Sequence, residues 1–200
     1  MSKLNKIRAF ICFKLPKRLI SSICRIQESV KQYELKIRWV RPENIHLTIK
    51  FLGDISWSDI DDIGMAIKET AADFAPLLLS AQGLGVFPNL KRPRVIWIGL
   101  SGQVEEFIGL QRMLDKKLRL IGFPKEKRPF KGHLTIGRVK WRLDARQLSD
   151  IINRFNKFET KQFFGDRIFL MQSELKPSGP IYTKLMSESL VGDSSSCGNL

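Results

Sequence analysis

One tetrapeptide occurs twice in this 200-residue chain, as His46-Leu47-Thr48-Ile49 and as His133-Leu134-Thr135-Ile136. The two copies contain the only two histidines of the sequence, and each copy lies in its own half of the chain. Each falls in a predicted strand that follows a proline-containing turn and precedes a predicted helix. A repeat of this kind indicates internal duplication, so we expect a molecule built from two related halves.

Side chains in a strand alternate between two faces, which places the histidine and the threonine of each copy together. His46 and Thr48 therefore share one face, as do His133 and Thr135, and the aliphatic residues of both copies point to the opposite face. A single histidine in such a motif is usually a half-buried strand residue that bonds to a neighbour. Two identical copies that hold both histidines of the chain favour a paired site instead.

These four polar side chains have the chemistry that cleavage of a phosphodiester needs. Histidine titrates near pH ~6.5, so one imidazole can be neutral while the other is protonated at working pH. Such a pair supplies a general base and a general acid on opposite sides of a reacting centre. Each threonine hydroxyl can donate a hydrogen bond to a phosphate oxygen and so stabilise the charge that develops there.

Other site chemistries have weaker support in the sequence. Two histidines and three scattered cysteines do not form a zinc-ligand set, and the chain has no Walker-type glycine loop and no Gly-x-Ser-x-Gly turn. The acidic cluster Asp59-Asp61-Asp62 is typical of a helix start rather than of a metal site. We therefore expect neither a metal nor a cofactor.

Basic residues are in excess and are unevenly distributed. The chain has 34 Lys and Arg against 20 Asp and Glu, which gives a formal net charge of +14. Residues 1–50 carry 12 basic and 3 acidic side chains, and residues 125–146 carry 8 and 2. Basic segments attract polyanions, most often nucleic acid, although solubility alone also accounts for such a composition. The asymmetry favours a partner that bears phosphate.

Hydrophobic periodicity predicts an α+β fold with largely antiparallel sheets, because several strands adjoin through short turns. Strands are predicted over 6–15, 37–40, 45–52, 77–86, 95–100 and 132–139, and a hairpin over 163–173 and 181–187. Helices are predicted over 16–30, from a capping box at Ser58 and Asp61 to Ala71, over 104–118 and over 148–155. Residues 1–190 are expected to form a single domain, and residues 191–200, rich in Ser, Gly and Asp, a disordered tail.

Composition also indicates a compartment. No run approaches the ~18 apolar residues that a membrane-spanning helix needs, so no membrane association is expected. The three cysteines are an odd number without Cys-x-x-Cys spacing, which favours a reducing compartment over a disulfide framework. We therefore expect a cytoplasmic protein.

The segments around both tetrapeptides resemble the two-histidine (2H) phosphoesterase superfamily. Within it they are most similar to the bacterial and archaeal RNA 2′,3′-cyclic phosphodiesterases, also called 2′-5′ RNA ligases. The segments that carry the resemblance are 8–16, 39–53, 86–88, 93–97, 130–138 and 179–182. They span about residues 6–187, nearly the whole chain. One departure is Gly132, which stands where relatives often have proline.

The resemblance implies two pseudo-symmetric lobes, each with an antiparallel sheet flanked by helices, and a catalytic cleft between them. It implies a monomeric RNA-processing hydrolase that opens RNA 2′,3′-cyclic phosphate ends to 2′-phosphates without a metal. His46 would be the general acid for the 3′ oxygen and His133 the general base for water, an order that the sequence does not fix. Thr48, Thr135 and Arg138 would bind the phosphate. In reverse, the same pair would join RNA ends through a 2′-5′ linkage.

Two other functions stay open at this point. One is a 2′-5′ oligonucleotide phosphodiesterase, and the other is a module that binds RNA or nucleotides without catalysis. The duplicated histidines argue against the second function, because binding needs hydrogen-bond donors but no titrating pair.

Five further residues are candidates for the cleft. Four aromatic residues could stack a base or belong to the core: Trp39, Phe87, Trp97 and Tyr182. Lys50 is expected on the strand face of His46 and Thr48, either at the rim of the cleft or in solvent.

Overall fold

The computed structural model describes residues 6–126 and 129–193. The helices are α1 (Lys17–Lys31), α2 (Ile60–Ala72), α3 (Val104–Leu120) and α4 (Ala145–Arg154), with 3-10 turns η2 (Pro42–Asn44) and η3 (Trp57–Asp59). The strands are β1 (Lys6–Lys14), β2 (Ile37–Trp39), β3 (His46–Ser56), β4 (Leu77–Phe87), β5 (Val95–Gly102), β6 (Leu134–Val139), β7 (Phe163–Gly165), β8 (Arg167–Lys176) and β9 (Gly179–Ser189). The predicted α+β class is confirmed.

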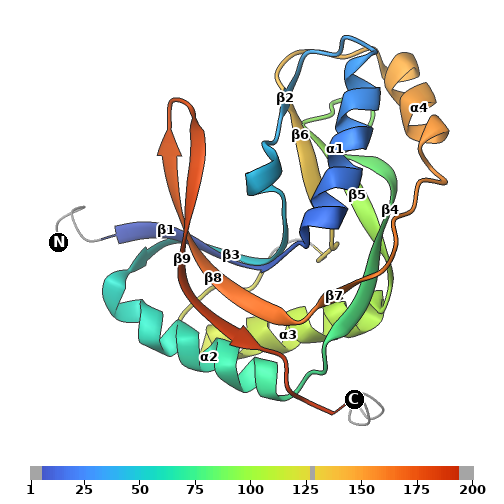
Figure 1. Cartoon of the computed structure of the whole chain (residues 1–200). Coiled ribbons are helices and arrows are strands. Elements are labelled where there is room, and N and C mark those ends of the chain that lie inside the picture. The colour runs from blue at the N-terminus through green and yellow to red at the C-terminus, as the bar shows by residue number, and fades with distance from the viewer. Residues whose placement is uncertain (1–5, 127–128, 194–200) are drawn as a thin grey trace.

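The antiparallel strands fall into two groups that form two lobes (Figure 1). Strands β3, β1, β8 and β9 form the first lobe, and β7, β4, β5 and β6, with β2 beside β6, form the second. A single residue pair, Leu47 of β3 and Leu134 of β6, connects the two groups. Both leucines belong to the repeated tetrapeptide. The repeat therefore occupies the same place in each lobe, at the line where the lobes meet.

Helices α1 and α3 pack away from the lobe that precedes them in the chain. Helices α2 and α3 lie against the first lobe, whereas α1 and α4 lie against the second (Figure 1). Helix α1 follows β1 of the first lobe, yet the Nε2 of its buried Gln27 donates to the main-chain oxygens of Val40 and Ile136, both at 2.9 Å. Helix α3 follows β5 of the second lobe but packs against α2. This exchange ties the lobes together.

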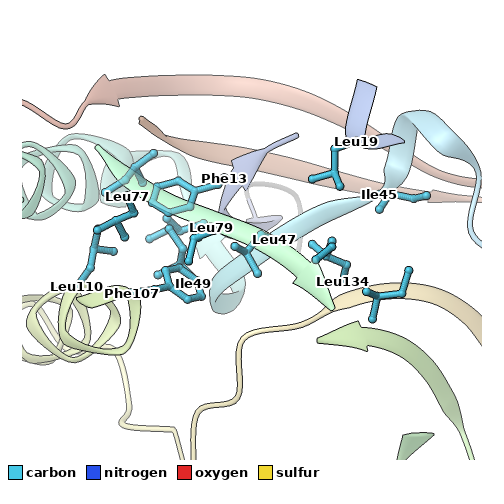
Figure 2. Close-up of a cluster of buried hydrophobic side chains, with 14 of the residues drawn as sticks. Phe13, Leu19, Ile45, Leu47, Ile49, Leu77, Leu79, Phe107, Leu110 and Leu134 are labelled. Carbon is cyan, nitrogen blue, oxygen red and sulfur yellow. The ribbon is translucent and has the colours of Figure 1, made fainter. Parts of the chain in front are cut away.

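One apolar core continues beneath both lobes. Leu47, Phe107 and Leu134 are fully buried in it, and Figure 2 shows them beside Phe13 and Leu79. The aliphatic residues of the tetrapeptides therefore face the core, as the strand period predicts. Truncation of one such leucine to alanine typically costs about 2–5 kcal/mol. No helix in the described residues is long and apolar enough to cross a membrane.

The capping box before α2 begins two residues earlier than predicted. The sequence contains Ser-x-x-Asp twice in overlap, and the structure uses Ser56 and Asp59 rather than Ser58 and Asp61. The main-chain N–H of Ser56 donates to Oδ2 of Asp59 at 2.7 Å. The box opens the 3-10 turn η3, which continues directly into α2.

The segment predicted as one strand over 163–173 is two strands that belong to different lobes. Strand β7 pairs with β4 of the second lobe, whereas β8 pairs with β1 and β9 of the first. Phe163 is buried, and Gly165 lies against the ring of Phe13, where a Cβ would be crowded. The predicted hairpin is therefore made by β8 and β9 alone.

The chain stays attached to the domain beyond Leu190. The main-chain N–H groups of Val191 and Gly192 donate to the oxygens of Ala71 and Phe74, at 3.1 and 3.0 Å. These two residues therefore bond to the end of α2 and to the segment after it, although they belong to the range expected to be a tail. Residues 194–200 of that range lie outside the described residues.

Candidate active site

A cleft of about 570 Å³ lies between the lobes, lined by β1, β3 and the β8–β9 hairpin on one side and by β2 and β6 on the other. Four of the five predicted site residues line it, namely His46, Thr48, Thr135 and Arg138. The fifth, His133, is not part of the cleft lining, but Leu134, which follows it, pairs with Leu47, which follows His46. The two tetrapeptides thus meet at one site.

The two imidazoles are held in the same way. Nδ1 of His46 lies 2.8 Å from the main-chain oxygen of Asn44, and Nδ1 of His133 lies 2.7 Å from that of Lys131. A carbonyl oxygen only accepts hydrogen bonds, so Nδ1 must carry the proton in both rings. Nε2 of each ring has no hydrogen-bond partner among the described residues and is free to exchange a proton.

Aromatic rings pack against both imidazoles. Phe10 stacks on His46 with ring centroids 4.6 Å apart, and Tyr182 contacts the same imidazole edge-on at 5.3 Å. His133 has Phe87 edge-on at 4.9 Å and Trp97 at 6.3 Å. Three of the four aromatic candidates for base stacking therefore pack on the histidines instead. The fourth, Trp39, is half-buried in the wall of the cleft.

Both histidines are harder to protonate than a histidine in water. Burial, together with the smaller effects of the Arg138 and His133 charges, lowers the pKa of His46 to about 4, against the raising effect of the hydrogen bond to the Asn44 carbonyl. Burial also lowers the pKa of His133, with the Lys131 and Arg138 charges acting in the same direction. Both rings are therefore neutral at pH 7 in the free protein. A bound anion would oppose these effects.

A β-bulge occurs at the last residue of each tetrapeptide. In β3 the register passes from Thr48 to Lys50 and leaves Ile49 unpaired, and in β6 it passes from Thr135 to Gly137 and leaves Ile136 unpaired. An extra residue reverses the alternation of faces beyond it.

The bulge in β6 explains why Arg138 lines the cleft. In a regular strand, a residue five positions after His133 would point away from it. Because of the bulge, Arg138 returns to the face of Thr135, where its charge contributes to the lowered pKa of His46 and of His133.

The bulge in β3 removes Lys50 from the cleft, so the prediction that it lies at the rim or in solvent is wrong. Lys50 is only 4% exposed and forms an ion pair with Asp115 of α3. Its Nζ also donates to the main-chain oxygen of Pro124 at 2.8 Å. Phe51 takes its place on the cleft face, where it is 57% exposed.

Sequence reasoning missed several residues of the cleft wall. Arg8, Arg38 and Arg41 line it together with Arg138, and its lining contains no Asp or Glu. The excess of basic residues in the first quarter of the chain was the available signal.

Phe10 was missed because the prediction placed only the odd-numbered residues of the first predicted strand, from Ile7 to Leu15, on a buried face. The opposite face is also covered, by a small cluster of Phe10, Cys12 and Met171. No cluster of metal-ligating residues is present in the described ranges.

The family described as LigT-like phosphoesterase matches the chain twice, over residues 13–97 and 98–182. The boundary between the two matches falls within β5, so each match contains one copy of the tetrapeptide. The duplication inferred from the repeat is therefore present at the level of the family as well.

The chain is similar over nearly its whole length to named relatives. A protein of Methanothermobacter thermautotrophicus named RNA 2′,3′-cyclic phosphodiesterase is 36% identical over 90% of this chain and 97% of its own length. A protein of the same name from Aquifex aeolicus is 35% identical over 88% and 94%. A solved structure from Thermus thermophilus superposes with a TM-score of 0.80 at 28% identity and covers 94% of this chain and 100% of that one. The resemblance to the two-histidine phosphoesterases is confirmed, and the chain belongs to the LigT-like phosphoesterase family.

Proposed function

We propose that this protein hydrolyses RNA 2′,3′-cyclic phosphate ends to 2′-phosphates by acid–base catalysis without a metal or a cofactor. The observation that carries the proposal is that His46 and His133 are oriented in the same way. In each ring Nδ1 bonds to a main-chain carbonyl, and Nε2 has no partner among the described residues. The name of the relatives at 35–36% identity supports the same activity. One chain supplies every group of the site, so we propose that it acts as a monomer.

The reaction is a single displacement at phosphorus. Nε2 of His133 takes a proton from water as the water oxygen bonds to phosphorus, and Nε2 of His46 gives a proton to the 3′ oxygen as the P–O3′ bond breaks. The phosphate stays on the 2′ oxygen. The two histidines finish with their protonation states exchanged, and solvent restores them before the next turnover.

The remaining groups act on the charge of the phosphate. The hydroxyls of Thr48 and Thr135 donate to the non-bridging oxygens, and the guanidinium of Arg138 lies opposite the negative charge that grows as water adds. The phosphate in turn raises the pKa of the nearby imidazoles. Substrate binding thereby allows His46 to take up from solvent the proton that it lacks in the free protein.

A substrate with sulfur in place of the 3′ oxygen tests the order of the two roles. A thiolate is a far better leaving group than an alkoxide and needs little help from an acid. His46→Ala should therefore recover most of its lost rate on this substrate, while His133→Ala should stay slow. Recovery by His133→Ala instead would mean that His133 is the general acid and His46 the general base.

A product assay separates this function from the two alternatives. Phosphorus NMR should show a 2′-phosphate when the protein is incubated with a nucleoside 2′,3′-cyclic phosphate and a 2′-5′ dinucleotide. Cleavage of the dinucleotide alone would identify a 2′-5′ phosphodiesterase, and binding without any product would identify a non-catalytic module. Incubation with a 2′,3′-cyclic end and a 5′-hydroxyl end should give a smaller yield of the 2′-5′ linkage, since water competes with the hydroxyl.

We also propose that the protein works in the cytoplasm. The described cysteines, Cys12 and Cys24, are both free thiols, and burial raises the pKa of Cys12 to about 12, which keeps this thiol unreactive. These thiols support a reducing compartment.

A further inference from the structure

Two arginines face one another across neighbouring strands in the cleft. Arg38 of β2 lies directly opposite Arg138 of β6 in the antiparallel register, so the two side chains stand on the same face. Like charges in this arrangement are destabilising unless an anion lies between or beside them. Arg8 on the opposite wall differs, since its cross-strand partner in β3 is Asp54.

The protein itself does not supply the anion. None of the arginines in the described residues belongs to an ion pair, and the lining of the cleft holds no carboxylate. Arg38 and Arg138 therefore place two positive charges without a counter-ion on neighbouring strands of the cleft. One phosphate beside Arg138 leaves the charge of Arg38 uncompensated.

The side chain of Arg38 extends toward the turn of the β8–β9 hairpin. Its Nη2 lies 3.4 Å from the point that a Cβ on Gly179 would occupy, so a larger residue there would crowd it. Arg41 meets the same turn, where its Nη2 donates to the main-chain oxygen of Ser178 at 2.6 Å. The guanidinium of Arg38 thus lies beside the hairpin turn, whereas Arg138 follows Thr135 in β6 and its charge acts on both histidines.

We propose that Arg38 binds the phosphate on the 5′ side of the terminal nucleotide, while Arg138 serves the cyclic phosphate. This proposal rests on the function proposed above. A 2′,3′-cyclic phosphate ends its strand, so every other phosphate of the RNA lies on the 5′ side of that ribose. The cleft then selects strand ends and 5′-phosphorylated nucleotides over nucleosides that carry the cyclic phosphate alone.

A matched pair of small substrates tests the subsite. Adenosine 2′,3′-cyclic phosphate is compared with the same compound bearing a 5′-phosphate, and kcat/KM is measured for each. In the unaltered protein the 5′-phosphate should raise kcat/KM by about 10- to 100-fold, the range of a hydrogen bond between charged groups. In Arg38→Ala this ratio should fall to about 1, whereas Arg138→Ala should slow both substrates.

Arg119→Ala is the control variant. Arg119 is exposed near the end of α3, outside the cleft lining, and its loss removes the same charge from the chain. The substrate ratio of this variant should equal that of the unaltered protein. A ratio near 1 in the unaltered protein, or an unchanged ratio in Arg38→Ala, would overturn the proposal.

Binding of the reaction products separates this proposal from the proposed function. Calorimetry gives the Kd of adenosine 2′-phosphate and of adenosine 2′,5′-bisphosphate without any turnover. The bisphosphate should bind at least about 10-fold more tightly, and Arg38→Ala should abolish that difference. If this holds while neither cyclic compound is hydrolysed, the anion subsite stands and the proposed function fails. Equal affinities in the unaltered protein would overturn the subsite even if hydrolysis is observed.

Discussion

Each histidine of the cleft depends on a carbonyl oxygen two residues before it in the chain. Asn44 holds His46 and Lys131 holds His133, and both bonds use Nδ1. Each bond spans only two residues of the chain and orients both imidazoles in the same way. The tetrapeptide repeat indicates the two histidines and two threonines as candidates, but it does not include the residues that supply the carbonyls. The aromatic contacts come from other segments of the chain, so the repeat does not predict them either.

Loss of either imidazole should nearly abolish turnover. His46→Ala and His133→Ala are each expected to lower kcat by at least ~10²-fold, the contribution of a positioned acid or base. The double variant should be little slower than either single one, because the two groups act as a unit. Steady-state kinetics on a cyclic nucleotide measures this, with circular dichroism to show that each variant is folded. Most of the activity surviving in either single variant would exclude the pair mechanism.

The two imidazoles should titrate at acidic pH and respond to phosphate. With the pKa of His46 at about 4 in the free protein, its proton is lost as the pH rises through that value. A bound product phosphate favours the protonated ring, so the titration of His46 should move to higher pH. NMR follows both rings readily because the chain has only two histidines.

The same shift should appear in the kinetics. The optimum of kcat, which reports the complex, should lie at higher pH than the optimum of kcat/KM, which reports the free protein. Titration of His46 near pH ~6.5, the ordinary value for histidine, in the free protein would contradict this account. The same holds if phosphate did not change the pH at which His46 titrates.

At the scale of elements, the two β-bulges decide which side chains reach the site. Regular alternation places Lys50 with Thr48 and sends Arg138 to the other face. The bulges at Ile49 and Ile136 reverse both assignments. A bulge is a property of the register between strands, so a single strand's sequence does not reveal it. For the same reason the transfer of β7 to the second lobe was not predictable, although the strands and helices themselves largely were.

The buried ion pair behind β3 should be costly to break but replaceable. Lys50→Met leaves Asp115 buried without a counter-charge and should lower the free energy of unfolding by about 3–5 kcal/mol. The double variant Lys50→Met/Asp115→Leu should recover most of this loss, because two apolar groups need no partner. Urea denaturation measures both. If Lys50→Met had the same free energy of unfolding as the unaltered protein, the ion pair would not contribute to stability in this way.

At the scale of the whole molecule, the lobes share one core and exchange helices. Helix α1 hydrogen-bonds to β6 of the second lobe, and α3 packs on α2 of the first. The core cluster contains buried residues of both lobes, so neither lobe has a separate hydrophobic core. The sequence did not predict which lobe α1 and α3 pack against, because this depends on tertiary contacts.

The lobes should consequently unfold together. In a Trp57→Phe chain the remaining tryptophans, Trp39, Trp97 and Trp141, all belong to the second lobe, so their fluorescence reports on that lobe alone. Its urea transition should coincide with the far-ultraviolet circular dichroism of the whole chain, as in a two-state protein. Two separate midpoints would show that the lobes are independent domains.

The single contact between the sheets, Leu47 with Leu134, also fixes where the molecule can flex. His46 and His133 are the residues that precede these leucines in the chain. If one lobe rotated against the other about this pair, points close to it would move least. The spacing of the two imidazoles would then change less than the distance from the β8–β9 turn to the opposite wall of the cleft.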